Sequence, residues 1–224
     1  MNKVSSLQEL LRQGVVYRPR LQAQHESAVI DTGYQRLNQW LPPKGWPQQA
    51  LVELIAPCMG CGEIQLLLPA LRRVQQAGGL VFLLNPPAVP YPQSWQHQHI
   101  ALEQLWWIDV ADQPENLWWV AEQVCQTDIQ SILLIWPAHE HGLHQPTVQR
   151  GTRRLQAALR GSQTLAFVLH ACSPSPLKDS QLRLTLSSQL NAHDVRSLHL
   201  EMHKCKGFPI ANQPCILPLE YGYV

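Results

Sequence analysis

The segment that most constrains this fold is LVELIAPCMGCGEIQLLLPAL, residues 51–71. Its first five residues are an apolar, β-favourable run, and a turn with Gly60 and Gly62 interrupts that run. From Ile64 onward, leucines recur at helical spacing. The segment therefore predicts a buried strand, a glycine turn and an amphipathic helix, which is the order of elements found in phosphate-binding loops.

The turn lacks the side chains of a working phosphate loop, which are a Lys for the β and γ phosphates and a Ser or Thr for Mg²⁺. With Gly62 as the last loop glycine, Glu63 stands at the Lys position, and Ile64 and Gln65 stand where a hydroxyl is needed. A carboxylate repels a polyphosphate. We therefore expect a degenerate nucleotide loop, comprising Gly60, Gly62, Glu63 and Ile64. An ordinary strand–turn–helix without nucleotide ancestry is the alternative.

The residues before and within this segment resemble the RecA ATPase core, where a TG-x(3)-LD-x(2)-LGGG-x-P-x-G segment precedes the phosphate-binding strand. The positions that match are Thr32, Gly33, Leu37, Leu41, Gly45, Pro47, Val52 and Glu53. The chain is more similar to the RecA-like branch called ImuA and to the related SulA cell-division inhibitors, which carry TELL-x(3)-G-x-GE-[LI]-x-LLLPAL in place of the ATPase motif. The positions that match are Glu53, Leu54, Gly60, Gly62, Glu63, Ile64 and residues 66–71.

The resemblance covers roughly residues 30–206 and implies a RecA-like α/β fold, with a mostly parallel sheet, flanking helices and an antiparallel C-terminal edge. Residues 1–30 are expected to form an N-terminal helix and a linker arm, residues 31–206 the core domain, and residues 207–224 a tail. Leucines behind a Ser cap place the first helix at residues 5–16. The tail is apolar and aromatic, but its pattern indicates no pairing.

Apolar runs and helical spacings alternate along the core, as in a parallel sheet with crossover helices. Strands are expected at residues 51–55, 80–84, 105–110, 131–136 and 165–169, helices at 114–126 and 147–160, and a loop rich in Pro and Trp at 90–99. Residues 182–186 and 198–203 alternate apolar with polar side chains, which predicts antiparallel strands at the edge of the sheet.

Two strand ends argue against ATP hydrolysis. In RecA the end of the strand that matches residues 80–84 supplies the Glu that activates water, but here Asn85 and two prolines follow. Trp136 ends a later strand, where the resemblance implies a Mg²⁺-linked Asp. We therefore expect no catalytic residue, no metal and no cofactor, and a protein that is not an enzyme.

Charge is distributed unevenly along the chain. Residues 101–149 contain seven acidic and no basic residues, whereas residues 150–206 contain nine basic and three acidic ones. This pattern indicates a basic face for DNA or an acidic partner, or faces that meet neighbouring subunits; clustered surface charge is the plainer explanation. The candidate contact residues are Arg150, Arg153, Arg154, Lys204 and Lys206, and Trp118 and Trp119. One of the two tryptophans is expected in the core and the other at a protein contact.

Three shorter patterns allow a chemical function but are better explained without one. Cys58 and Cys61 form a C-x-x-C that suits zinc or redox chemistry, but no second pair follows at metal-finger spacing. The HEHGLH segment at residues 139–144 holds three histidines, which we interpret as solvated loop residues. Residues 181–185 resemble the peptide that docks on the sliding clamp, but they lack its final aromatic residue and alternate as a strand does.

The resemblance implies a non-catalytic accessory protein of damage-induced (SOS) mutagenesis. Its partners would be the Y-family-like protein ImuB and also the RecA filament, the error-prone polymerase or DNA, during translesion synthesis. A SulA-like inhibitor that binds the tubulin-like division protein is the alternative, and a DNA-binding recombination regulator is a further one. Only 15% of the residues in the chain are charged, and the chain contains eight tryptophans. This composition favours a standing partner or a homo-oligomer. We expect a cytoplasmic protein without membrane contact, because the sequence has no 18-residue apolar run and no signal-peptide layout.

Overall fold

A computed structural model describes residues 29–58, 60–110, 116–127, 129–137, 145–171, 177–190 and 196–218. The helix expected at residues 5–16 and the histidine-rich segment at 139–144 lie outside these ranges. So do almost all of the linker arm and the last six residues of the tail, 219–224.

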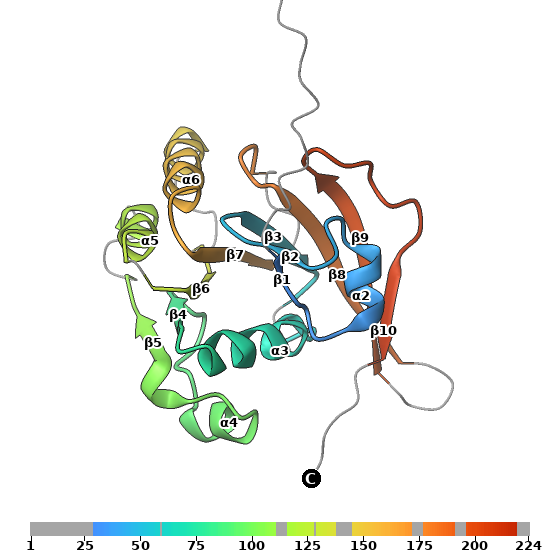
Figure 1. Cartoon of the computed structure of the whole chain (residues 1–224), viewed down its shortest axis with the longest axis horizontal. Helices are drawn as coiled ribbons and strands as arrows, with labels where there is room; N and C mark the ends of the chain where they lie inside the picture. Colours follow the sequence, from blue (N-terminus) through green and yellow to red (C-terminus); the bar gives the residue numbers. More distant parts are fainter. Residues whose placement is uncertain are drawn as a thin grey trace, which may run out of the picture.

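An eight-stranded sheet forms the centre of the described chain (Figure 1). In spatial order its strands are β10 (Cys215–Pro218), β9 (Arg196–Cys205), β8 (Leu182–Leu190), β3 (Leu51–Ala56), β7 (Thr164–Ala171), β6 (Ser131–Ile135), β4 (Leu80–Leu84) and β5 (Leu105–Ile108). Neighbouring strands from β8 to β5 pair in parallel. At the other end of the sheet, β9 runs antiparallel to β8, and β10 runs antiparallel to β9. The chain therefore has the expected α/β fold, with a mostly parallel sheet and an antiparallel end.

Helices cover both faces of this sheet (Figure 1). On one face α3 (Glu63–Gln76) packs against the sheet, and on the other α5 (Leu117–Cys125) and α6 (Gln145–Leu159) lie side by side. Successive side chains of a strand point to opposite faces, and this alternation divides the buried residues into two clusters. The short elements are β1 (Val29–Ile30), α2 (Gln35–Trp40), β2 (Trp46–Pro47), α4 (Pro92–His97) and η1 (Leu102–Gln104). None of the described helices has the length and apolar character needed to cross a membrane.

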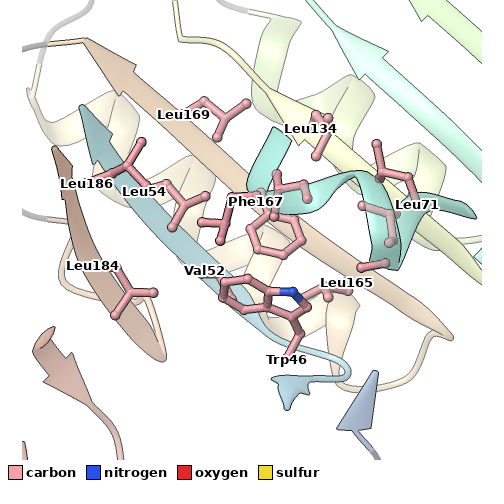
Figure 2. Packing of buried hydrophobic residues seen from close by; sticks show 14 of the residues in the cluster. Trp46, Val52, Leu54, Leu71, Leu134, Leu165, Phe167, Leu169, Leu184 and Leu186 are labelled. Carbon is pink, nitrogen blue, oxygen red and sulfur yellow. The ribbon is translucent and has the colours of Figure 1, made fainter. Parts of the chain in front are cut away.

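The larger core cluster lies between α3 and the sheet, and aromatic side chains stand near its centre (Figure 2). Trp46 and Phe167 are both fully buried, and their rings meet edge to face with centroids 5.1 Å apart. Such a pair contributes about 0.5–1.5 kcal/mol beyond the burial of its area. Trp46 comes from the small β1–β2 sheet, so this contact fastens the small sheet to the central one.

A proline inside α3 explains how the residues before β3 are attached. Pro69 has no N–H, so the helix leaves the carbonyl of Gln65 without its usual donor. The hydroxyl of Tyr34 donates to that carbonyl at 3.1 Å. Beside it, a Cβ added to Gly33 would lie 2.1 Å from the Cβ of Pro69, so only glycine allows this approach. The contacts therefore join the residues around Gly33 to the middle of α3.

Most elements agree with the sequence-based expectations, within a few residues at their ends, but two segments differ. Residues 90–99, expected as a loop, contain α4, which begins with Pro92 at its first position. The tail, whose pattern indicated no pairing, contributes β10, which pairs with β9. Cys215 and Leu217 alternate inward and are buried there. The sequence pattern did not reveal this pairing, because four residues are too short a run to stand out in a sequence that is rich in proline.

Candidate functional site

The loop after β3 is a glycine turn that leads from a strand into a helix, in the order of elements that the sequence predicted. Gly60 and Gly62 have φ angles of 79° and 107°, in the left-handed region that residues with a side chain rarely adopt. Gly62 is the N-cap of α3, and its carbonyl accepts the first helical hydrogen bond, from the Leu66 N–H at 2.9 Å. The loop therefore directs the N-terminus of α3 toward the carboxyl end of β3, where parallel sheets commonly bind ligands.

Glu63 fills this loop with its own carboxylate. Its Oε1 accepts a hydrogen bond from the Gly60 N–H at 2.7 Å, and its side chain is 7% exposed. Its Oε2 is buried, and no described residue donates to it. Unpaired N–H groups and the helix dipole make a helix N-terminus attractive to an anion. In this loop the carboxylate stands where a phosphate would find those donors.

This arrangement changes the chemistry of the loop. A phosphate that approached would meet a negative charge, and the Gly60 N–H already has an acceptor. Ile64 is half-buried and packs against the larger core cluster, so the next helical position offers no polar group to a metal or a nucleotide. The loop therefore presents a buried carboxylate and an apolar side chain at the N-terminus of α3.

The neighbouring strand ends hold each other in place. After β4, Asn85 has a φ of 57°, and its side-chain N–H donates to the carbonyl of Trp136 at 3.1 Å. After β6, the Trp136 N–H donates to the carbonyl of Leu84 at 3.0 Å, and its indole is 6% exposed in the core. The positions directly after β4 and β6 thus carry an amide and a buried indole, and neither provides a carboxylate for a metal or an attacking water.

A polar cluster that the sequence did not predict lies on the face of the sheet opposite α3. Glu53, in β3, is fully buried, and its Oε2 accepts from Arg183 Nε at 2.6 Å. Arg183 is its register partner on β8. The Ser180 hydroxyl donates to the same carboxylate oxygen at 3.3 Å, and the Leu177 N–H donates to Oε1 at 3.3 Å. The cluster therefore neutralises a carboxylate in the centre of the fold. The only indication of this cluster in the sequence is Glu53, a single acidic residue in an apolar strand.

His170, on β7, borders this cluster as an uncharged side chain. Burial, followed by the positive charge of Arg183, lowers the pKa of His170 from its ordinary value of 6.5 to about 4. Its Nε2 lies 3.6 Å from Glu53 Oε1, a proximity that on its own favours the charged form. Because that carboxylate already pairs with Arg183, we expect burial to dominate. Nε2 is buried and has no hydrogen-bond partner among the described residues.

The basic candidates on α6 are exposed, and one of them is already paired. Arg154 forms a salt bridge with Glu122 of α5, with 2.5 Å between Nη2 and Oε2. Glu122 belongs to the acidic stretch of the sequence, so acidic and basic segments meet within a single chain. Arg150 and Arg153 also lie on the exposed surface of α6. They are the members of this group that remain accessible to a phosphate or an acidic partner.

The basic candidates at the end of β9 form a separate group. Lys204 Nζ donates to the carbonyl of Lys178 at 2.7 Å, and burial, more than nearby charges, lowers the Lys204 pKa. Lys206 is exposed, and its backbone N–H donates to the carbonyl of Gln181. In the sheet, β8 separates β9 from β3, which is the nearest strand that α6 contacts. The five basic candidates thus belong to two regions of the chain.

The adjacent tryptophans of α5 have different environments, as expected. Trp118 is 4% exposed and packs against α6, where a Cβ on Gly151 would lie 2.4 Å from its ring. Trp119 is 53% exposed. Sequence analysis did not single out Trp106 and Trp107 on β5, which are also about half exposed. Within the described chain β5 pairs only with β4, so these two indoles project from an edge strand.

The described residues contain no group of three or more His, Cys, Asp and Glu that could hold a metal ion. The fold and the loop together define an α/β protein with a glycine turn after β3, in which the Glu63 carboxylate accepts a hydrogen bond from the Gly60 N–H. No protein-family model matches the chain, and no curated protein matches it either.

Proposed function

We propose that this chain is a RecA-like accessory protein that acts by binding other proteins and does not hydrolyse ATP. The observation that carries the proposal is the buried Glu63 carboxylate, which accepts the Gly60 N–H at 2.7 Å inside the loop after β3. The loop has neither a lysine nor a hydroxyl at the positions that ATP chemistry requires. Asn85 and Trp136 follow the strands that would supply the water-activating and metal-binding carboxylates.

The arrangement of the chain supports the RecA-like assignment. Parallel strands with crossover helices, followed by an antiparallel hairpin, are the order that the resemblance implies. The two motif segments that resemble this branch are also in contact. Gly33 packs against Pro69, and the Tyr34 hydroxyl bonds to the Gln65 carbonyl. Such contacts are expected if the lead-in motif and the LLLPAL motif form one structural unit.

The role we propose is in damage-induced mutagenesis, with ImuB as the main partner and with the RecA filament or the error-prone polymerase as further contacts. This part of the proposal depends on the resemblance to ImuA. The structure adds three exposed candidate contact residues, which are Trp106 and Trp107 on opposite sides of the edge strand β5 and Trp119 on α5. Exposed tryptophans bind proteins well because each buries a large rigid area. An edge strand such as β5 can also pair with a strand of another chain.

A SulA-like inhibitor of the tubulin-like division protein would use the same fold and the same occupied loop, so the partner itself must distinguish the two functions. The experiment is a side-by-side capture of ImuB and of the division protein by the full chain. We expect capture of ImuB. Capture of the division protein alone would assign the chain to the SulA-like function instead.

Variants test these candidate contact residues in the same experiment. Replacing both Trp106 and Trp107 by Ala should weaken ImuB capture at least tenfold, since each is a candidate anchor worth about 2 kcal/mol or more. Leu190→Ser is the matched control, because Leu190 is 67% exposed near the other end of the sheet. Equal capture by the double variant and by wild type would exclude the β5 edge as the ImuB surface.

The proposed lack of catalysis is tested by steady-state ATP hydrolysis. We expect no turnover above the buffer rate with Mg²⁺ present. Turnover that disappears in Gly62→Ala would overturn the proposal, because it would show that the loop still handles phosphate. Glu63→Gln keeps the shape of the side chain and removes its charge. It should bind nucleoside triphosphate more tightly than wild type does if repulsion by the carboxylate is what keeps phosphate out.

A further inference from the structure

A pair of thiols in the loop after β3 has no role in the proposed function. Cys58 Sγ and Cys61 Sγ lie 3.2 Å apart, in an S–H···S contact. A disulfide has an S–S distance of about 2.05 Å, so the two sulfur atoms need to approach by only about 1 Å. The two thiols therefore already lie close to the separation that a disulfide bond requires.

The two cysteines differ in accessibility in the way that an exchange reaction requires. Cys58 is exposed, whereas Cys61 is buried, at 9% exposed. An external disulfide can therefore reach Cys58 and not Cys61. Gly60 and Gly62, with their left-handed φ angles, lie beside the pair. Their backbone freedom allows the small adjustment that brings the sulfurs together.

We propose that Cys58 and Cys61 form a dithiol–disulfide couple that exchanges with low-molecular-weight disulfides such as oxidised glutathione. The Cys58 thiolate attacks one sulfur of that disulfide, forms a mixed disulfide and releases the first thiol. The Cys61 thiolate then attacks Cys58 Sγ, closes the intramolecular bond and releases the second thiol. The protein loses two electrons and two protons, and the external disulfide takes them up and becomes two thiols. The proposal does not depend on the proposed function.

The other described cysteines differ from this pair. Cys125 and Cys215 are buried, and burial raises the pKa of both thiols, that of Cys125 to about 12. Burial raises the pKa of the half-buried Cys205 as well. A thiol with a raised pKa supplies little thiolate, and the thiolate is the attacking species. These three cysteines are therefore expected to stay reduced, and they serve as internal controls.

The test is equilibration of the full chain, without oxygen, in glutathione buffers of increasing oxidised fraction. The reaction is quenched with acid, the remaining thiols are alkylated, and peptides are mapped by mass spectrometry. We expect most molecules to acquire one Cys58–Cys61 disulfide, in a single two-electron titration. Wild-type glutathione adducts at Cys58 with Cys61 still a thiol would overturn the proposal, and so would a disulfide from Cys58 to another cysteine.

Single variants separate the two steps. Cys61→Ser should trap the mixed disulfide, so that the intramolecular product falls to none and a glutathione adduct at Cys58 replaces it. Cys58→Ser should leave Cys61 unmodified. Cys125→Ser is the matched control and should titrate as wild type does. One zinc ion bound per chain, and lost in either loop variant, would assign the pair to metal binding and overturn the redox proposal. The wild-type mapping decides the question even if Cys61→Ser fails to fold.

Discussion

Glu53 is the residue whose environment is hardest to anticipate from its neighbours in the sequence. It lies in a strand of otherwise apolar residues, is fully buried, and bonds to Arg183, which is 130 positions later in the chain. A buried ion pair is a weak source of net stability, because removing both charges from water offsets much of their attraction. Removing one partner, however, leaves a buried charge without compensation.

Arg183→Met should therefore lower the free energy of unfolding by about 3–5 kcal/mol. Replacing both members, Glu53→Leu with Arg183→Met, should recover most of that loss, because no charge then remains buried. Urea denaturation of the two variants and wild type at pH 7 provides the comparison. A double variant as unstable as Arg183→Met would show that the polar contacts of Ser180 and Leu177, rather than the charge pair, determine stability at this point.

His170 should make the folded state sensitive to mild acid. Its pKa is about 4 in the folded protein and 6.5 as an ordinary histidine, so below pH 6.5 the unfolded state takes up a proton that the folded state does not. Stability is therefore greatest above pH 6.5 and decreases as pH falls toward 4. By pH 4 the loss from this one group is about 3 kcal/mol.

The measurement is urea unfolding of wild type and of His170→Gln at several pH values between 7 and 4. The advantage of wild type over the variant should shrink by about 3 kcal/mol across that range. Titrating groups that are distant from His170 cancel in the difference. A difference that does not change with pH would mean that His170 takes up its proton equally in both states.

At the scale of elements, the attachment of the α2 region to α3 depends on one close approach. Gly33 has a φ of 84°, and an added Cβ would lie 2.1 Å from the Cβ of Pro69. Gly78, after α3, has nearly the same φ, 83°, but an added Cβ there would have no atom within 4 Å. An alanine substitution would cause the same backbone strain at both glycines. The two sites differ in the space around the added methyl group.

Gly78→Ala should therefore cost about 1–2 kcal/mol, from backbone strain alone. Gly33→Ala should cost a further 1–3 kcal/mol or so, because its methyl group must displace Pro69 or the chain before α2. Thermal and urea unfolding of both variants measure the difference. Equal costs would mean that the two segments separate easily, and that their contact contributes little to the fold.

Elements were predictable from the sequence where the pattern is local. The alternation and helical spacing of apolar residues indicated β3, β4 and β6 within one residue at each end, and the start of α3 equally well, because the core selects side chains at those periods. The order of the strands was not readable in this way, and neither was β10. Parallel neighbours such as β3 and β7 are more than a hundred residues apart, and no local pattern encodes that register.

At the scale of the whole molecule, the distribution of charge is more dispersed than the sequence suggested. The basic residues lie in two groups, and Arg154 is paired with Glu122 inside the chain. DNA binding, if it contributes to the proposed function, would therefore use the exposed Arg150 and Arg153 on α6. Contacts of this kind release counterions, so the binding would weaken steeply with added salt.

Charge reversal at both positions, Arg150→Glu with Arg153→Glu, should leave the fold intact because both side chains are exposed. If α6 contacts DNA, the double variant should lose affinity at low salt and should show a salt dependence shallower by about two phosphate contacts. Fluorescence anisotropy with short duplex and single-stranded DNA measures both quantities. Lys206→Glu is the matched control on the other basic group. Unchanged affinity in the α6 variant would exclude that helix as the DNA surface.

By itself, the sequence determined the class of fold and the chemical character of the loop after β3. Apolar periodicity is a local property, and Glu63 and Ile64 are in the loop whatever surrounds it. Only the tertiary structure decided that the Glu63 carboxylate bonds to Gly60, that Glu53 meets Arg183 and His170, and which tryptophans are exposed. These outcomes depend on the packing of segments that are far apart in the chain, and on burial, which is a property of the assembled molecule.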